Sequence, residues 1–129
     1  SKVRSTLSIQ GAETVKAGVG MDTGKSRNNY ETVAAEGKNG GLVTAWSSPR
    51  KNDGRFGTAV IVPWLPEGRA VESEGCTYWT REIGNGKTFD WYMGAVWDKA
   101  SPVKSAADWE AEARRVRECI GNPLRVKVR

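Results

Sequence analysis

Alternation of apolar and polar residues along the chain predicts a protein built mainly from β-strands. Residues 2–9 place Val3, Leu7 and Ile9 on one side, as a half-buried strand does. Residues 58–62 (TAVIV) form a continuous apolar run, which is typical of a strand covered on both faces. Turn-forming residues separate these segments from the other strands that the same pattern predicts, at residues 13–21, 30–36, 42–47, 76–83 and 88–97.

One segment near the end of the chain has helical spacing instead. Ser105 and Asp108 resemble a capping box, and Gly121 followed by Pro123 supplies a stop signal. These signals predict a helix over residues 105–120, with one apolar stripe for packing on a sheet. The stripe consists of Trp109, Ala113, Val116 and Ile120.

The order of these elements indicates the fold class. Many strands in succession, followed by one helix, favour an antiparallel β-sandwich with a helix at its edge. Residues 124–128 alternate again and predict a final short strand. Because residues 1–100 show no helical spacing, a parallel α/β fold is excluded. A chain of 129 residues is either a single domain or the C-terminal segment of a larger one.

Composition narrows the chemistry. The sequence holds no histidine and two cysteines, which excludes histidine-based triads and zinc sites with four thiolates. We therefore expect no metal and no cofactor. No apolar run approaches the roughly 18 residues of a membrane helix, so no membrane partner is expected. Cys76 and Cys119 could form a disulfide or remain buried free thiols, and the sequence leaves both open.

The net charge of +5 comes from one end of the chain. Without residues 114–129, the basic and acidic residues balance, so the sequence does not describe a broad positive field for nucleic acid. The basic face of the final strand could still bind an acidic partner. That face consists of Arg125, Lys127 and Arg129.

The strand expected at residues 88–97 carries the candidate ligand site. One side of it holds large apolar residues and is the predicted core side. The other side turns Asp90 and Tyr92 outward. Gly94 on that outward side leaves a gap through which a ligand could approach the backbone. The predicted core side consists of Phe89, Trp91, Met93, Ala95 and Trp97.

Two neighbouring segments complete the candidate site. An Asn-Gly pair after residues 76–83 is typical of a hairpin turn, so we expect that strand to pair with residues 88–97 and to bring Arg81 or Glu82 near. Trp64, in a loop between two prolines, would form a wall. Aromatic rings cover the flat faces of sugars, polar groups bond their hydroxyls, and Arg81 would favour a uronic carboxylate. The predicted carbohydrate site consists of Trp64, Arg81, Glu82, Asp90 and Tyr92.

The aromatic residues also have an interpretation in which they only pack. Those at the core positions of residues 88–97 and of the helix are expected to fill the interior. For Trp64 and Tyr92, binding and packing both stay open. Paired carboxylates are the remaining route to hydrolysis without histidine, but the spacing of the acidic residues selects no pair. Whether the protein is an enzyme therefore stays open.

Short phrases rich in aromatic residues and glycine run through the chain. They occupy residues 15–20 (VKAGVG), 57–62 (GTAVIV), 90–97 (DWYMGAVW), 108–110 (DWE) and 122–126 (NPLRV). Together they resemble the C-terminal part of an uncharacterised bacterial family associated with polysaccharide-degradation operons. The resemblance implies a β-sandwich of the galactose-mutarotase type, and it implies that the chain corresponds to about the last third of a family member.

These observations lead to one main functional expectation and one alternative. We expect a carbohydrate-active or carbohydrate-binding β-sandwich that acts on polysaccharide fragments in the periplasm or outside the cell. Its expected partners are an oligo- or polysaccharide and, at open sheet edges, a second copy of the chain or a missing N-terminal segment of the same protein. The alternative is a non-enzymatic interaction domain that uses the basic C-terminal face on an acidic partner.

Overall fold

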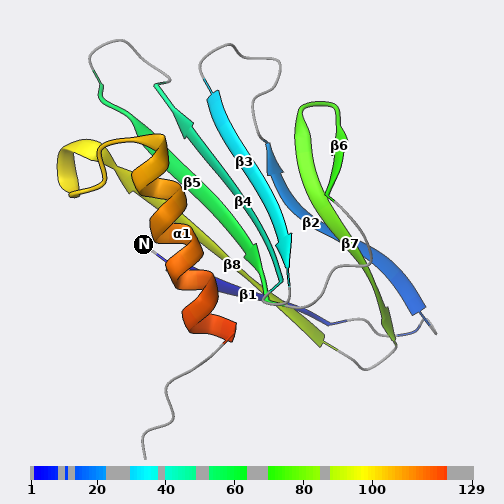
Figure 1. The fold of residues 1–129 in the computed structure, drawn as a ribbon. Coiled ribbons are helices and arrows are strands. Elements are labelled where there is room, and N and C mark those ends of the chain that lie inside the picture. Colours follow the sequence, from blue (N-terminus) through cyan, green and yellow to red (C-terminus); the bar gives the residue numbers. More distant parts are fainter. Residues whose placement is uncertain are drawn as a thin grey trace, which may run out of the picture.

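Two antiparallel sheets and one long helix make up the described part of the computed structural model (Figure 1). The strand order is β1-β8-β5-β4-β3 in the five-stranded sheet and β2-β7-β6 in the three-stranded sheet. The structure describes residues 2–8, 11, 14–22, 30–37, 40–48, 53–63, 70–84 and 88–121. The elements are β1 (Lys2–Ser8), β2 (Thr14–Asp22), β3 (Tyr30–Gly37), β4 (Gly40–Ser47), β5 (Phe56–Val62), β6 (Val71–Ser73), β7 (Cys76–Gly84), β8 (Thr88–Trp97), η1 (Asp98–Ala100) and α1 (Ala106–Gly121).

The predicted fold class is confirmed: the protein is mainly β, with one helix after the strands. Each of the seven strands expected within the described residues is present. Strand β6 was not predicted, because it has three residues, all exposed, and therefore no apolar pattern. The strand expected at residues 124–128, with its basic face, lies outside the described residues.

Strand β4 lies at the centre of the molecule, and all eight of its residues are buried. Helix α1 covers one face of the five-stranded sheet, and the three-stranded sheet covers part of the other (Figure 1). The turn before β4 is tighter than expected, since Gly37 and Gly40 already face each other in the ladder. Gly40 has a φ of 97°, and a Cβ there would lie 1.9 Å from the Val62 carbonyl oxygen, so glycine is required.

Alternation along β4 and β5 supplies two separate cores. One set of side chains points toward the three-stranded sheet and the other toward α1. This explains the apolar run in β5, which is buried on both faces from Ala59 to Val62, although Thr58 is exposed. The inter-sheet core consists of Val19, Val43, Val60, Val62, Trp79 and Ile83. The helix-side core consists of Leu42, Trp46, Ala59, Ile61, Trp109 and Ala113.

Helix α1 begins where its capping residues predict. The Asp108 amide donates to the Ser105 hydroxyl oxygen at 3.1 Å, which satisfies one of the free amides of the first turn. The Asp108 carboxylate accepts from the Lys104 amide at 3.2 Å, one residue before the partner that a capping box would use. The predicted apolar stripe is confirmed, because Trp109 and Ala113 are buried and the stripe's other members pack against the same core.

The expected hairpin between β7 and β8 is wrong. Strand β7 pairs with β2 and β6, whereas β8 pairs with β1 and β5 in the other sheet. Residues 85–87, the turn of the expected hairpin, lie outside the described residues. The Asn-Gly signal describes local turn geometry, but pairing depends on which strand edges are available.

The expected faces of β8 are also corrected. Its predicted core side faces the three-stranded sheet, where Trp91 packs against the inter-sheet core. That sheet is too narrow to cover the rest of the strand, so Met93 and Trp97 are each 41% exposed. The predicted solvent side faces α1 instead, and Tyr92 and Val96 pack against the helix-side core.

The two cysteines are free thiols, and both are exposed. Cys76 begins β7, and Cys119 lies near the end of α1. The expectation of buried thiols is therefore wrong, and no disulfide joins these residues.

Candidate functional site

A pocket of about 580 Å³ lies between α1 and β8, on the helix side of the five-stranded sheet. Helix α1 packs mainly on β4 and β5, which leaves the neighbouring face of β8 open beside it. Residues 101–103, between η1 and α1, contribute to the wall. The volume falls within the roughly 300–1,000 Å³ of pockets that bind small organic molecules.

Small residues on two adjacent strands create this hollow. Gly94 of β8 and Ala59 of β5 face each other in the ladder, and both line the pocket. Two residues before Ala59 on β5, Gly57 packs against the indole of Trp109. A Cβ at Gly57 would lie 2.8 Å from three atoms of that ring. The Trp109 indole N–H donates to the Thr58 carbonyl at 2.9 Å, which fixes the ring. Trp109 thus anchors the helix at Gly57, and the small residues Gly94 and Ala59 form the floor of the pocket beside it.

Charged residues of α1 form one side of the pocket. Arg115 donates to Glu112 through Nη2 at 2.6 Å and through Nε at 3.1 Å, and its Nη1 lies 3.9 Å from the Cys119 sulfur. All three residues line the pocket. The hydrogen bond from Arg115 lowers the pKa of Glu112, so this carboxylate is ionised at neutral pH. The rim therefore carries a fixed ion pair.

A second ion pair lies next to Tyr92, outside the pocket lining. Arg4 of β1 faces Tyr92 across the ladder, and its Nε donates to the Asp90 carboxylate at 3.0 Å. Its Nη2 donates to the same oxygen. This hydrogen bond, then the charge of Asp90 and then that of Tyr92 raise the pKa of Arg4. Tyr92 lines the pocket, whereas Arg4 and Asp90, which lie beside it, do not.

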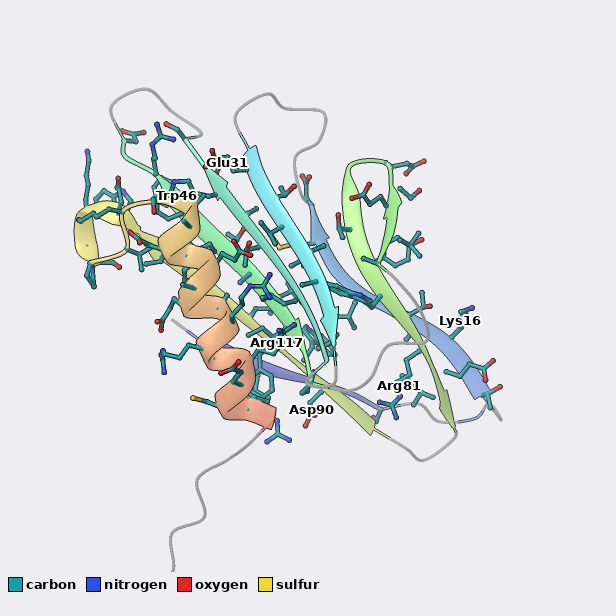
Figure 2. All side chains as sticks on the ribbon, viewed as in Figure 1. Lys16, Glu31, Trp46, Arg81, Asp90 and Arg117 are labelled. Atoms are coloured by element: carbon teal, nitrogen blue, oxygen red, sulfur yellow. The ribbon has the colours of Figure 1, made fainter. Side chains whose placement is uncertain are left out.

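The predicted site residues do not come together as one site. Tyr92 lines the pocket, and Asp90 lies beside it on the same face of β8. Arg81 and Asp90 belong to different sheets (Figure 2), and Arg81 shares the inter-sheet face of β7 with buried Trp79. Glu82 is exposed on the outer face of β7. Trp64 lies outside the described residues.

Two residues of the pocket lining, and one residue next to Tyr92, were not predicted from the sequence. Glu112 and Arg115 stand at i and i+3 on α1, beside its apolar stripe, and this spacing alone could have suggested a paired rim. Arg4 shares the polar side of β1, but its partner Asp90 is 86 positions away along the chain. No local signal could have joined those two.

Arg117 extends from α1 toward the strands (Figure 2) and raises a separate question. Its Nε and Nη1 atoms are buried and have no hydrogen-bond partner in the described part of the protein. Burial, followed by the charge of Arg114, lowers the pKa of this guanidinium. Arg117 does not line the pocket, so we treat it as a feature of stability rather than of the site.

Other kinds of site find no support within the described ranges. No group of three or more acidic or cysteine side chains there could hold a metal ion. None of the helices in this part of the chain has the length and apolarity needed to cross a membrane. The basic residues Arg125, Lys127 and Arg129 lie outside the described residues.

Comparison with known proteins identifies the family of this chain. No curated protein matches the chain. A family model, described as a domain of unknown function (DUF4861), matches residues 1–126, which is nearly the whole sequence. The chain therefore belongs to the DUF4861 family.

Proposed function

We propose that this domain binds fragments of a polysaccharide in the pocket between α1 and β8. The observation that carries the proposal is the position of Tyr92, an aromatic residue in the lining of a largely apolar pocket, with the Arg4–Asp90 pair next to it. Apolar surface suits the C–H faces of a sugar ring, and fixed polar groups suit its hydroxyls. The Glu112–Arg115 pair supplies a second set of polar groups on the rim.

Binding rather than bond cleavage is the proposed activity. A general acid must hold a proton at neutral pH, which requires a carboxyl whose pKa is raised. Glu112 and Asp90 each accept hydrogen bonds from an arginine, and the pKa of Glu112 is lowered. Glu112, the carboxylate of the described pocket lining, is therefore suited to accept hydrogen bonds from a ligand, not to protonate it.

The resemblance to a family from polysaccharide-degradation operons supports the same proposal. With it we propose a periplasmic or extracellular location, where such fragments occur. We also propose a relationship to galactose-mutarotase-type sandwiches, which a structural superposition of the two packed sheets would test.

Calorimetric titration with a broad panel of neutral and acidic oligosaccharides tests for binding. We expect a heat of binding with at least one class of saccharide, and the absence of any heat of binding across the panel would refute the proposal. The two cysteines then locate the ligand. Cys119 lines the pocket, and Cys76 lies on the other sheet, so a bound saccharide should slow alkylation of Cys119 alone. Equal rates with and without ligand at Cys119 would place the site elsewhere.

Substitutions then test the floor of the pocket. Gly94→Val places a branched side chain on the pocket face, and Tyr92→Ala removes the ring; both should abolish binding. Gly18→Val and Tyr78→Ala make the same changes on the three-stranded sheet and should leave binding unchanged. Circular dichroism verifies that every variant is folded. If folded Gly94→Val binds like the parent, the pocket is not the site.

A further inference from the structure

The charged residues at the pocket between α1 and β8 are paired with residues of opposite charge. Among the described residues that line it, Glu112 and Arg115 are the charged ones, and they bond to each other through two hydrogen bonds. On the far side of Tyr92, the Arg4 guanidinium bonds to the Asp90 carboxylate through two nitrogens. Within the described residues, the charges of the pocket lining therefore balance, and the Arg4–Asp90 pair beside Tyr92 also joins opposite charges.

Each ion pair places a donor beside an acceptor. A guanidinium has only donors, and an ionised carboxylate has only acceptors. Arg115 uses Nε and Nη2 on Glu112, and within the described residues its Nη1 has only the weak acceptor of the Cys119 sulfur at 3.9 Å. Arg4 uses Nε and Nη2 on Asp90, which leaves its Nη1 to donate elsewhere. A hydroxyl group both donates and accepts, so two adjacent hydroxyls match such a pair.

An anionic ligand is poorly matched to the same arrangement. A carboxylate on the ligand would have to approach Arg115 next to the ionised Glu112, or Arg4 next to the ionised Asp90. The repulsion between the two carboxylates offsets the attraction of the arginine. Arg81, on which a preference for uronic acids would rest, lies on the inter-sheet face of β7 and is absent from the pocket lining.

Resting on the proposed function above, we infer that the pocket takes neutral saccharides in preference to uronic acids. The Glu112–Arg115 pair of the lining recognises a pair of hydroxyls and disfavours a carboxylate, and the Arg4–Asp90 pair offers the same pattern to a ligand that extends past Tyr92. The Tyr92 ring and the small floor residues accept the apolar face of the sugar.

Matched ligands test this inference directly. The probes are galactotriose and galacturonic acid trisaccharide with the same linkage, and cellotriose with its glucuronic counterpart. We expect each neutral trisaccharide to bind at least about tenfold more tightly than its acidic counterpart. The affinity of the neutral ligands should change less than about twofold between low and high salt, because no net charge is neutralised on binding.

One substitution reverses the expected preference. Glu112→Gln removes the carboxylate and leaves the Arg115 guanidinium uncompensated, so the acidic trisaccharides should gain about tenfold in affinity. Glu110→Gln is the matched control, because Glu110 forms the same kind of pair with Arg114 on α1 and does not line the pocket. This control should leave both affinities unchanged.

The outcomes separate the inference from the proposed function. Tighter binding of the neutral ligands, with a gain for the acidic ones only in Glu112→Gln, supports the inference. Equal or tighter binding of the acidic trisaccharides by the parent protein overturns it and leaves saccharide binding intact. Binding of neither class overturns the proposed function and the inference together.

Discussion

Because Trp109 packs directly against Gly57, the effect of Gly57→Ala on the free energy of unfolding should change sign when Trp109 is removed in a double-mutant cycle. A methyl group at position 57 would lie 2.8 Å from three atoms of the indole, so Gly57→Ala must displace the ring. Overpacking of this kind costs about 1–3 kcal/mol. Replacing a glycine within a strand by alanine also stabilises the folded state, by about 0.5–1 kcal/mol, because glycine loses more conformational freedom on folding. The net result is a loss of about 1 kcal/mol in the free energy of unfolding.

The opposite result is expected once the indole is gone. Trp109, 7% exposed, is a core residue, and Trp109→Ala should cost about 3–5 kcal/mol. In that background the methyl group of Gly57→Ala enters an empty space, so the second substitution should stabilise the protein by about 0.5–1 kcal/mol. Trp109→Leu provides a milder background in case the alanine variant does not fold. The coupling energy is then about 1–3 kcal/mol.

Urea denaturation followed by far-ultraviolet circular dichroism measures all four corners of the cycle. Gly18→Ala is the control, because the nearest atoms to a Cβ at Gly18 would be two ring carbons of Tyr78, at 3.3 and 3.7 Å, and the Trp79 carbonyl oxygen at 3.8 Å, none of which belongs to Trp109. Its effect should be the same in both backgrounds. The reasoning fails if Gly57→Ala is equally destabilising with and without Trp109, or if Trp109→Ala costs less than about 1 kcal/mol.

Other features of the structure make independent predictions. Arg117→Met should raise the free energy of unfolding by about 1 kcal/mol, because it removes buried donors without partners; a higher urea midpoint checks this, and a lower one would reveal a partner. The Arg115 hydrogen bond lowers the pKa of Glu112 in the folded state. The Glu112–Arg115 pair therefore stabilises the protein above the pKa that Glu112 has in the unfolded chain, and this contribution disappears as the pH falls through the pKa of Glu112 in the folded state. Titration by NMR should therefore give Glu112 a lower midpoint in the parent than in Arg115→Gln, and equal midpoints would contradict the pair. Without denaturant, Cys76 and Cys119 should both react with Ellman's reagent, whereas a silent thiol would contradict its exposure.

Local patterns in the sequence predicted the elements well. The helix was recognisable because its cap, its stripe and its stop signal lie within one short segment. The strands were recognisable from alternation, and the apolar run of β5 correctly indicated burial on two faces from Ala59 onward. Each of these signals depends on residues that are near one another in the chain.

The arrangement of the elements could not be read in the same way. The partners of β8 are β1 and β5, neither of which adjoins it in the sequence, and an Asn-Gly turn signal misdirected the pairing toward β7. The exposure of Met93 and Trp97 depends on the width of the other sheet, which composition does not encode. Gly94 and Tyr92 line the pocket, but the face of β8 that carries them was expected to be open to solvent, and the rim of the pocket belongs to α1.

The pairing of β1 with β8 has a consequence for the order of folding. Strands β3, β4 and β5 follow one another and can form a meander early, since only short loops must close. The Arg4–Asp90 contact spans 86 positions, so β1 adds to the sheet only after a very long loop has closed. Until then, the edge of β8 is available to any other strand, including β1 of another molecule. Strand exchange during refolding at high protein concentration is therefore the misfolding route that this topology favours.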